Sequence, residues 1–165
     1  MKDKSFYILI TSILLLCVMS LMLIVFLNRA DEKFEGSITA TENGITETLI
    51  PVRDLVLSPG ISKEYDVNLI CEASGVYFVH LDLQENHDGG MKEFVNVVIE
   101  FDGEKVHEGP LTELLDDGLV VETTATLEAE EPVLITFRYS MPVTIGNEAQ
   151  GTTSEFDVHV IIEKK

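Results

Sequence analysis

Hydrophobic and polar residues follow two different patterns along this chain of 165 residues. Residues 6–27, FYILITSILLLCVMSLMLIVFL, form one apolar run without a charged residue. From residue 45 onward, apolar residues instead alternate with polar ones at a period of two. Because that period places successive side chains on opposite faces of a strand, this part of the chain is predicted to form sheets with one dry and one wet face.

Several segments carry the alternation clearly, including the last one before the C-terminus. There, four apolar residues are interleaved with Glu155, Asp157, His159 and Ile161. About seven to nine short strands of this kind favour a two-layer sandwich. The residues predicted to face its core are Tyr65, Val67, Leu69, Cys71, Tyr77, Val79, Leu81, Leu83, Val95, Val97, Ile99, Phe101, Leu119, Val121, Ala125, Leu127, Val133, Ile135, Phe137, Tyr139, Met141, Phe156, Val158, Val160 and Ile162, with Thr123 in step.

Turn signals separate these segments at regular intervals. Asp102-Gly103, between Phe101 and Glu104, is the strongest short hairpin signal in the chain. The stretch LTELLDDG predicts a single helical turn with Thr112 as its N-cap. The other predicted reversals are Ser58-Pro59-Gly60, Asp116-Asp117-Gly118, Glu131-Pro132 and Gly146-Asn147. The fold class predicted is an all-β, jelly-roll or immunoglobulin-like antiparallel β-sandwich preceded by one transmembrane helix.

The apolar run is long enough to cross a membrane. As a helix, residues 6–27 rise roughly 33 Å, which matches the ~30 Å hydrocarbon core of a bilayer. A cleaved secretory signal, the alternative, has an apolar region of about 7–15 residues and ends at small residues. Here the run ends Leu27-Asn28-Arg29-Ala30, which favours a retained signal anchor over a cleaved signal.

The predicted organisation therefore has four parts, with the folded domain outside the cell. Lys2 and Lys4 before the run nearly balance Arg29 and Lys33 after it, and the free amino terminus tips the orientation toward an N-terminus inside. The protein is predicted to be a single-pass protein of the cell membrane. Its parts are a flank at 1–5, a transmembrane helix or uncleaved anchor at 6–27, a polar stalk at 28–44 and an extracytoplasmic β-sandwich at 45–165.

The charge and the cysteine content limit which binding partners and which disulfide bonds are expected. Residues 31–165 contain 8 Lys or Arg and 28 Asp or Glu, a net charge of −20, which excludes a nucleic-acid-binding surface. Solubility of an exposed domain explains this charge, and loose binding of divalent cations by clustered carboxylates is the alternative. Cys17 lies inside the apolar run, so it cannot pair with Cys71, which is predicted to be a buried thiol.

Catalytic and metal-binding motifs are not found. His80, His87, His107 and His159 make no H-E-x-x-H motif, although His80 and His87 lie at a predicted strand and its following loop. Residues 82–90, DLQENHDGG, place oxygen ligands at alternate positions but lack the glycine of a calcium loop, so a polar hairpin loop is predicted. No catalytic, cofactor-binding or metal-binding residue is assigned, and no cofactor is expected.

Three stretches in this order and spacing carry a family resemblance. They are LVLSPGISKEYDV at Leu55–Val67, FDGEKVHEGPLTELL at Phe101–Leu115 and MPVTIGNEAQGTTSEFDVHVIIE at Met141–Glu163. Together they resemble the TasA/camelysin family of secreted proteins from Gram-positive bacteria, over roughly residues 45–163. The chain departs from that family in its long N-terminal span and in its lack of a small-residue cleavage site.

The resemblance implies a function in surface or biofilm-matrix structure rather than catalysis. It implies a jelly-roll-like sandwich, a dedicated signal peptidase as a partner, and association with copies of itself or with a related fibre subunit. Family members form fibres when an N-terminal strand fills a groove in the next subunit, and the matching segment here is residues 36–50, with Ile38, Ile45 and Ile50 as apolar anchors. An ordinary first strand folded within the same chain is the favoured alternative for that segment.

Two other functions stay open at this stage. Camelysin-like proteins are labelled metalloproteases, so a metal-dependent peptidase is the first alternative to a non-enzymatic structural protein. An anchored accessory module that binds a ligand through its loops is the second. In every case the bilayer is expected to be a partner through residues 6–27.

Overall fold

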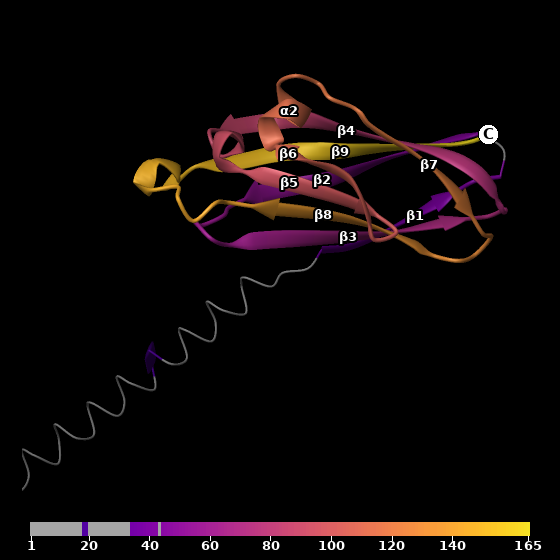
Figure 1. The fold of residues 1–165 in the computed structure, drawn as a ribbon, viewed down its shortest axis with the longest axis horizontal. Helices are drawn as coiled ribbons and strands as arrows, with labels where there is room; N and C mark the ends of the chain where they lie inside the picture. Colours follow the sequence, from indigo (N-terminus) through magenta and orange to yellow (C-terminus); the bar gives the residue numbers. More distant parts are fainter. Residues whose placement is uncertain (1–17, 20–33, 43) are drawn as a thin grey trace, which may run out of the picture. The chain divides into compact units, whose positions relative to one another are not determined.

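The computed structural model describes residues 18–19, 34–42 and 44–165. Val18 and Met19 have a helical backbone, and the rest of the predicted span at 6–27, like the flank at 1–5, lies outside the described residues. Within the described part of the chain, no helix is long and apolar enough to cross a membrane. The chain divides into two compact units, Met1–Glu32 and Lys33–Lys165, and the second contains the β-sandwich (Figure 1).

The described residues form nine strands and three short helical turns. The turns are the 3-10 helices η1 (Lys92–Phe94) and η2 (Asn147–Ala149) and the α-helix α2 (Leu111–Leu115). The strands are β1 (Phe34–Ala40), β2 (Ile45–Leu55), β3 (Ser62–Cys71), β4 (Gly75–Gly89), β5 (Asn96–Phe101), β6 (Glu104–Pro110), β7 (Val121–Leu127), β8 (Val133–Ser140) and β9 (Thr153–Lys164).

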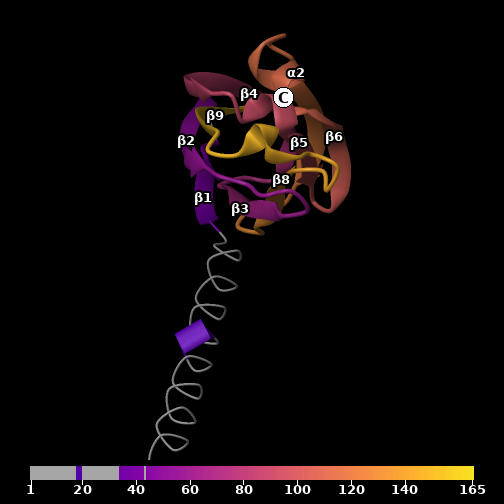
Figure 2. The ribbon, with the colours of Figure 1, turned by 90° about the vertical axis from the view of Figure 1, so that its left-hand side faces the viewer.

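These strands make two sheets that pack face to face, as Figure 2 shows in a view along the strands. One sheet has five strands in the order β1-β3-β8-β5-β6, and the other has four in the order β2-β9-β4-β7. The prediction of an all-β sandwich is therefore confirmed. The prediction that it is antiparallel needs one correction, because β1 pairs with β3 in parallel, whereas the other named pairs are antiparallel.

The inward faces of both sheets form the core, as the alternation predicts. On β9, Phe156, Val158, Val160 and Ile162 are at most 1 % exposed, while the residues between them face outward. The predicted inward residues of β3, β4, β5 and β8 are likewise buried, apart from half-buried Tyr65 and Val133. An exception is Leu119, which is exposed because β7 begins only at Val121.

The N-terminal boundary of the β-sandwich differs from the prediction. The stalk predicted at residues 28–44 includes Phe34–Ala40, which form β1 at the edge of the five-stranded sheet. The sandwich therefore begins before residue 45. Segment 36–50 lies partly in β1 and partly in β2.

Two local predictions are also corrected. The polar loop predicted at residues 82–90 is instead the continuation of β4, which pairs with β9 as far as Gly89 through a register shift between Glu85 and His87. Pairing with a long neighbour overrides a local sequence that is typical of a turn. The helix α2 begins at Leu111 and its N-cap is Pro110. Thr112 therefore lies within the helix and is not its N-cap.

The Asp102-Gly103 hairpin joins β5 to β6 as predicted. Both residues have positive φ, 52° and 76°, the geometry of a two-residue turn that matches strand twist. A Cβ added at Gly103 meets no atom within 4 Å, so the effect of a substitution there is confined to the backbone conformation.

We expect Gly103→Val to lower the free energy of unfolding by about 1–2 kcal/mol, because a β-branched residue resists positive φ. Gly103→Asn is the matched control and should cost less, since asparagine tolerates this region. Urea unfolding monitored by circular dichroism measures both variants. Equal stability of the valine and asparagine variants would contradict this explanation of the turn.

Candidate functional site

Strand β1 is a candidate for interaction because it lies at a sheet edge and pairs with a single named strand. Its seven residues run in register with β3, from Phe34 opposite Tyr65 to Ala40 opposite Cys71. Its outer edge has no paired strand among the described residues. An edge strand exposes backbone N–H and C=O groups that another extended segment can satisfy.

Few apolar side chains hold β1 in place. Its inward positions from residue 36 onward are Gly36, Ile38 and Ala40, and only Ile38 among them is large. Burying one isoleucine side chain contributes roughly 2 kcal/mol, so residues 36–40 of β1 depend largely on their backbone pairing with β3. By comparison, β9 buries four large or branched side chains along one face.

Beneath β1 lies a part of the core that would be exposed if the strand were to leave. Gly36, Ile38 and Ala40 pair with Val67, Leu69 and Cys71, all of which are at most 1 % exposed. Burial raises the pKa of the Cys71 thiol, so the thiol is protonated at neutral pH. Residues 67–71 of β3 would then form a new apolar edge.

The connection between β1 and β2 is a short turn held by exposed hydrogen bonds. The Thr41 N–H donates to Thr46 Oγ1 at 3.2 Å, and the Glu42 N–H donates to Glu72 Oε2 at 3.2 Å. The Glu72 N–H donates to the Ala40 carbonyl at 3.0 Å. Since water competes for exposed hydrogen bonds, these contacts restrain the turn only weakly.

Two of the other three sheet edges, β6 and β2, carry features that oppose strand addition, whereas the β7 edge has neither a proline nor a register shift. Strand β6 carries Glu104, Lys105 and Glu108 and ends in Pro110, and β2 contains Pro51 and a register shift after Val52. Charges, prolines and bulges on edge strands are known devices against pairing with other chains. The edge formed by β1 and β3 lacks prolines altogether.

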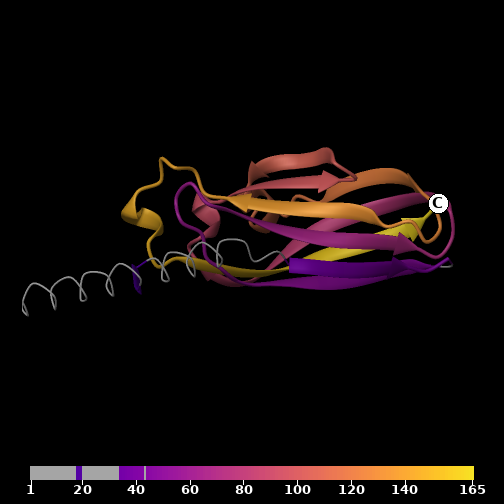
Figure 3. The same cartoon turned by 90° about the horizontal axis from the view of Figure 1, so that it is seen from below.

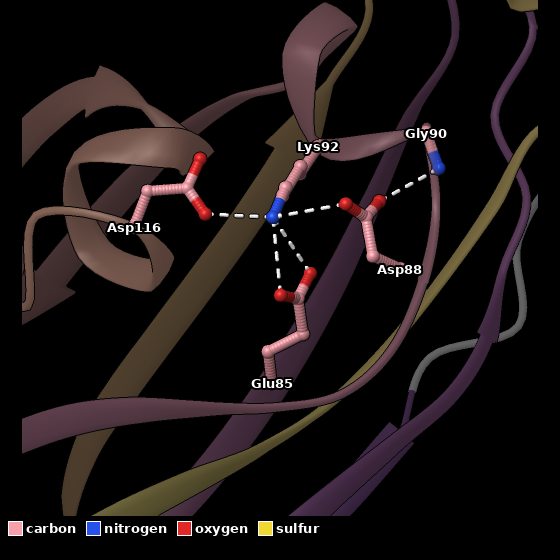
Figure 4. Close-up of polar contacts among 5 residues, drawn as sticks. All are labelled: Glu85, Asp88, Gly90, Lys92 and Asp116. Carbon is pink, nitrogen blue, oxygen red and sulfur yellow. Dashed lines mark hydrogen bonds and ion pairs between the residues drawn. The ribbon is translucent and has the colours of Figure 1, made fainter.

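A second polar feature is the cluster around Lys92, drawn in Figure 4. The Lys92 side chain is 9 % exposed, and its Nζ lies 2.6 Å from Asp116 Oδ1, 3.0 Å from Glu85 Oε1 and 3.1 Å from Asp88 Oδ2. Hydrogen bonding to Asp116, with further contributions from Glu85 and Asp88, raises the pKa of Lys92 despite the opposing effect of burial.

This Lys92 cluster connects three elements that adjoin one another at one end of the sandwich. Glu85 and Asp88 come from the bulged end of β4, Lys92 from η1, and Asp116 from the turn after α2. The Asp88 Oδ1 also accepts a hydrogen bond from the Gly90 N–H at 2.8 Å, and this bond and Lys92 lower the pKa of Asp88. The cluster clamps these three elements together, because each of its carboxylates is paired with the same ammonium.

The histidines considered from the sequence are spread over the sheets. His80 Nδ1 lies 3.1 Å from Glu122 Oε1, and His159 Nε2 lies 3.8 Å from Glu47 Oε2, both pairs on the outer face of the four-stranded sheet. His87 is on β4 and His107 on β6. Among the residues that the structure describes, no group of three or more His, Cys, Asp and Glu side chains is placed to hold a metal ion.

The sequence patterns predicted neither the edge position of β1 nor the Lys92 cluster. A signal for the cluster was a single lysine next to apolar Met91, soon after the carboxylates of β4. Nothing local pointed to Asp116, which follows 24 residues later.

Comparisons with known proteins give no family for this chain. No protein-family model matches it, and no curated protein is significantly similar to it. Among solved structures, a β-glucosidase from Paenibacillus barengoltzii matches 80 % of this chain at 13 % identity and a TM-score of 0.37, and the chain covers 12 % of that enzyme. These values are too low to support an argument about function.

Two further structures show the same distant similarity. The pre-peptidase C-terminal domain of a Bacillus anthracis collagenase matches 81 % of this chain and 96 % of its own length, with 9 % identity and a TM-score of 0.35. The CUB1-EGF-CUB2 domains of rat MASP-1 match 77 % of this chain and 42 % of their own, with 17 % identity and a TM-score of 0.38.

The Lys92 cluster generates a stability prediction. We expect Lys92→Met to lower the free energy of unfolding by about 2 kcal/mol, because it leaves three neighbouring carboxylates without their shared cation. Lys105→Met is the control: Lys105 pairs with Glu108 on the exposed surface, and its loss should change the urea midpoint little. Similar losses in the two variants would contradict the clamp.

The same variant has a predicted pH dependence. A carboxyl whose pKa is lowered on folding stabilises the fold above its unfolded value, about 3.9 for aspartate, and that contribution is lost as pH falls through the folded value. The stability gap between the wild type and Lys92→Met should therefore narrow below about pH 4. A gap that stays constant between pH 7 and pH 3 would show that the carboxylates are not responsible.

Proposed function

We propose that this chain is a non-enzymatic structural protein of the cell surface or biofilm matrix, held by residues 6–27 in the membrane with its sandwich outside the cell. It would associate with copies of itself, or with a related fibre subunit, through strand pairing. The proposal includes a jelly-roll or immunoglobulin-like topology and a relationship to the TasA/camelysin family. It rests on the resemblance of the three sequence stretches and on the properties of β1.

The observation that carries the proposal is the combination of the edge position of β1 and the small apolar area that its residues 36–40 bury. Ile38 is the one large side chain known to fix the strand from residue 36 onward, and the β3 edge beneath it offers Val67 and Leu69. An identical strand from a second copy satisfies the same backbone groups and fills the same space. Exchange of identical elements is therefore an inexpensive route to association.

Strand exchange would also explain how a strongly acidic domain can associate with a second copy of itself. A flat contact between two domains of net charge −20 suffers repulsion over the whole surface. Pairing along one narrow edge restricts the contact to the backbone of β1 and β3. The inward residues of β1 from Gly36 to Ala40 carry no charge, so no carboxylate is buried on this stretch when the strand is exchanged.

A disulfide that locks β1 to its own β3 tests the proposal. Ser37 and Asn68 are register partners, and both are exposed, so Ser37→Cys with Asn68→Cys, in a Cys17→Ser background, places two thiols side by side. We expect the full-length oxidised protein in detergent to lose the sedimentable assemblies that the reduced protein forms. Locking is preferable to deleting residues 36–50, because that deletion also removes Ile50 from the core.

The single variant Ser37→Cys in the same background is the matched control, since its register partner on β3 remains Asn68. The thiol that β3 does carry, Cys71, is buried opposite Ala40. It should assemble equally with and without reductant. Equal assembly of the locked and unlocked protein would rule out exchange of β1. Absence of any assembly from the wild-type protein would contradict the structural function itself.

A further inference from the structure

The two ends of the sandwich differ in where their exposed carboxylates lie. One end holds the connections β1–β2, β3–β4, β5–β6 and β7–β8, as the strand registers require. These connections are short and densely acidic. Their exposed carboxylates are those of Glu42, Glu72, Asp102, Glu128, Glu130 and Glu131.

The opposite end contains a surface that is almost free of charge, formed by residues 56–61 between β2 and β3 and residues 141–152 between β8 and β9. We call it the uncharged tip. Residues 56–61 carry no charged side chain, and residues 141–152 carry a single one, that of Glu148. Val56, Ile61 and Val143 are nevertheless 50 %, 40 % and 78 % exposed. Such a surface is unusual in a domain whose net charge is −20.

The two connections of the uncharged tip form one continuous surface. The Gly60 N–H donates to the Met141 carbonyl at 2.8 Å, and the Met141 N–H donates to the Ile61 carbonyl at 3.1 Å. Between them lies a cavity of about 390 Å³ whose lining residues are all uncharged, among them Pro59 and Ile145. Figures 1 and 3 show η2 and the β8–β9 connection extending past the other connections at this end.

The course of the chain relates this tip to the predicted anchor. Strand β1 runs parallel to β3 and begins opposite Tyr65, three residues after β3 starts at Ser62. The chain therefore enters the sandwich beside the first half of β3, the strand that directly follows residues 56–61 of the uncharged tip. Only residues 28–33 separate the predicted span from β1, and six residues reach at most about 20 Å. For an anchored domain, this end is the one within reach of the bilayer surface.

We propose that the uncharged tip rests on the lipid bilayer that holds the chain, with Val143, Val56 and Ile61 in contact with its interfacial region. This inference depends on the membrane anchoring in the proposed function. Apolar side chains gain from leaving water, and the acidic end is kept away from the negative surface potential of anionic lipids. The strand axes then stand away from the membrane, and the acidic connections project into solvent.

The chemistry of the tip also sets the expected strength of this contact. It contains no aromatic or basic side chain, the types that hold peripheral proteins on membranes by themselves. The contact therefore depends on the anchor, which keeps the tip at a high effective concentration near the lipid. Val143, the most exposed of the three side chains, should lie deepest.

The Lys92 cluster lies at the same end but is not part of this surface. Its three carboxylates are paired with Lys92 and come from β4 and from the turn after α2, and Figure 1 shows α2 set back from η2 along the sandwich. Glu93 of η1 and Asp117 after α2 are also exposed at this end, but neither belongs to residues 56–61 or 141–152, so the one charged side chain of the uncharged tip is Glu148.

Fluorescence quenching in vesicles tests the contact with the full-length chain. In a Cys17→Ser background, Val143→Cys is labelled with a polarity-sensitive dye, and Leu134→Cys, on β8 near the acidic end, is the matched control. Cys71 is 1 % exposed and stays unlabelled. In phosphatidylcholine vesicles containing lipids with nitroxide headgroups, the dye at position 143 should show a blue shift and loss of emission, and the dye at 134 neither.

The possible outcomes distinguish a failure of the tip contact from a failure of the membrane anchoring on which it depends. If the protein floats with the vesicles but the dye at 143 is not quenched, or both positions are quenched equally, the tip contact is wrong while anchoring stands. If the protein does not float, anchoring and the tip contact both fall. If the blue shift at 143 persists in detergent and disappears on dilution, a second copy covers the tip instead of lipid.

Discussion

Burial of alternate side chains between two sheets is the constraint on which the other features of this domain depend. Tyr139 of the five-stranded sheet and Phe156 of the four-stranded sheet meet edge to face with ring centroids 5.5 Å apart, and both are fully buried. Burial raises the pKa of Tyr139, which keeps its phenol neutral within this core. Because the sandwich is closed by such contacts, its edges and ends are what remain for interaction with other molecules.

Strands whose alternation is clean and long could be predicted from the sequence. β9 and β5 belong to this group, since their inward positions are apolar apart from Ser154 at the start of β9, and the turns beside them carry glycine at the expected places. β1 could not, because it offers Gly36, Ser37 and Thr39 around Ile38, a composition equally typical of a linker. What makes it a strand is pairing with β3, which begins more than twenty residues later.

The end of β4 shows the same limit. Residues Glu85 to Gly89 read locally as a turn, yet they continue as a strand because β9 is long enough to pair with them and Lys92 neutralises their carboxylates. Neither partner is visible within a short window of sequence. The Lys92 cluster is assembled by the fold, because its carboxylates come from separate elements and form no sequence motif. Only the unusual position of Lys92 itself could be noticed in the sequence.

The two proposed interactions of the molecule use surfaces that point in different directions. The β1–β3 edge is directed sideways, where a neighbouring copy can pair, and the uncharged tip is directed along the strand axes, where the bilayer is proposed to lie. The acidic connections at the far end favour neither contact and keep the domain in solution. A surface protein that assembles beside its neighbours while standing on a membrane needs these two directions to be separate.

The central claim is that β1 can leave its edge while the remaining sandwich stays folded. Hydrogen–deuterium exchange of the full-length protein, followed by mass spectrometry, tests it most directly. If β1 detaches, amides of residues 36–40 exchange through a local opening, well before those of β8 and β9. If residues 36–40 exchange only together with β8 and β9, β1 opens only when the whole domain unfolds, and strand exchange at this edge is contradicted.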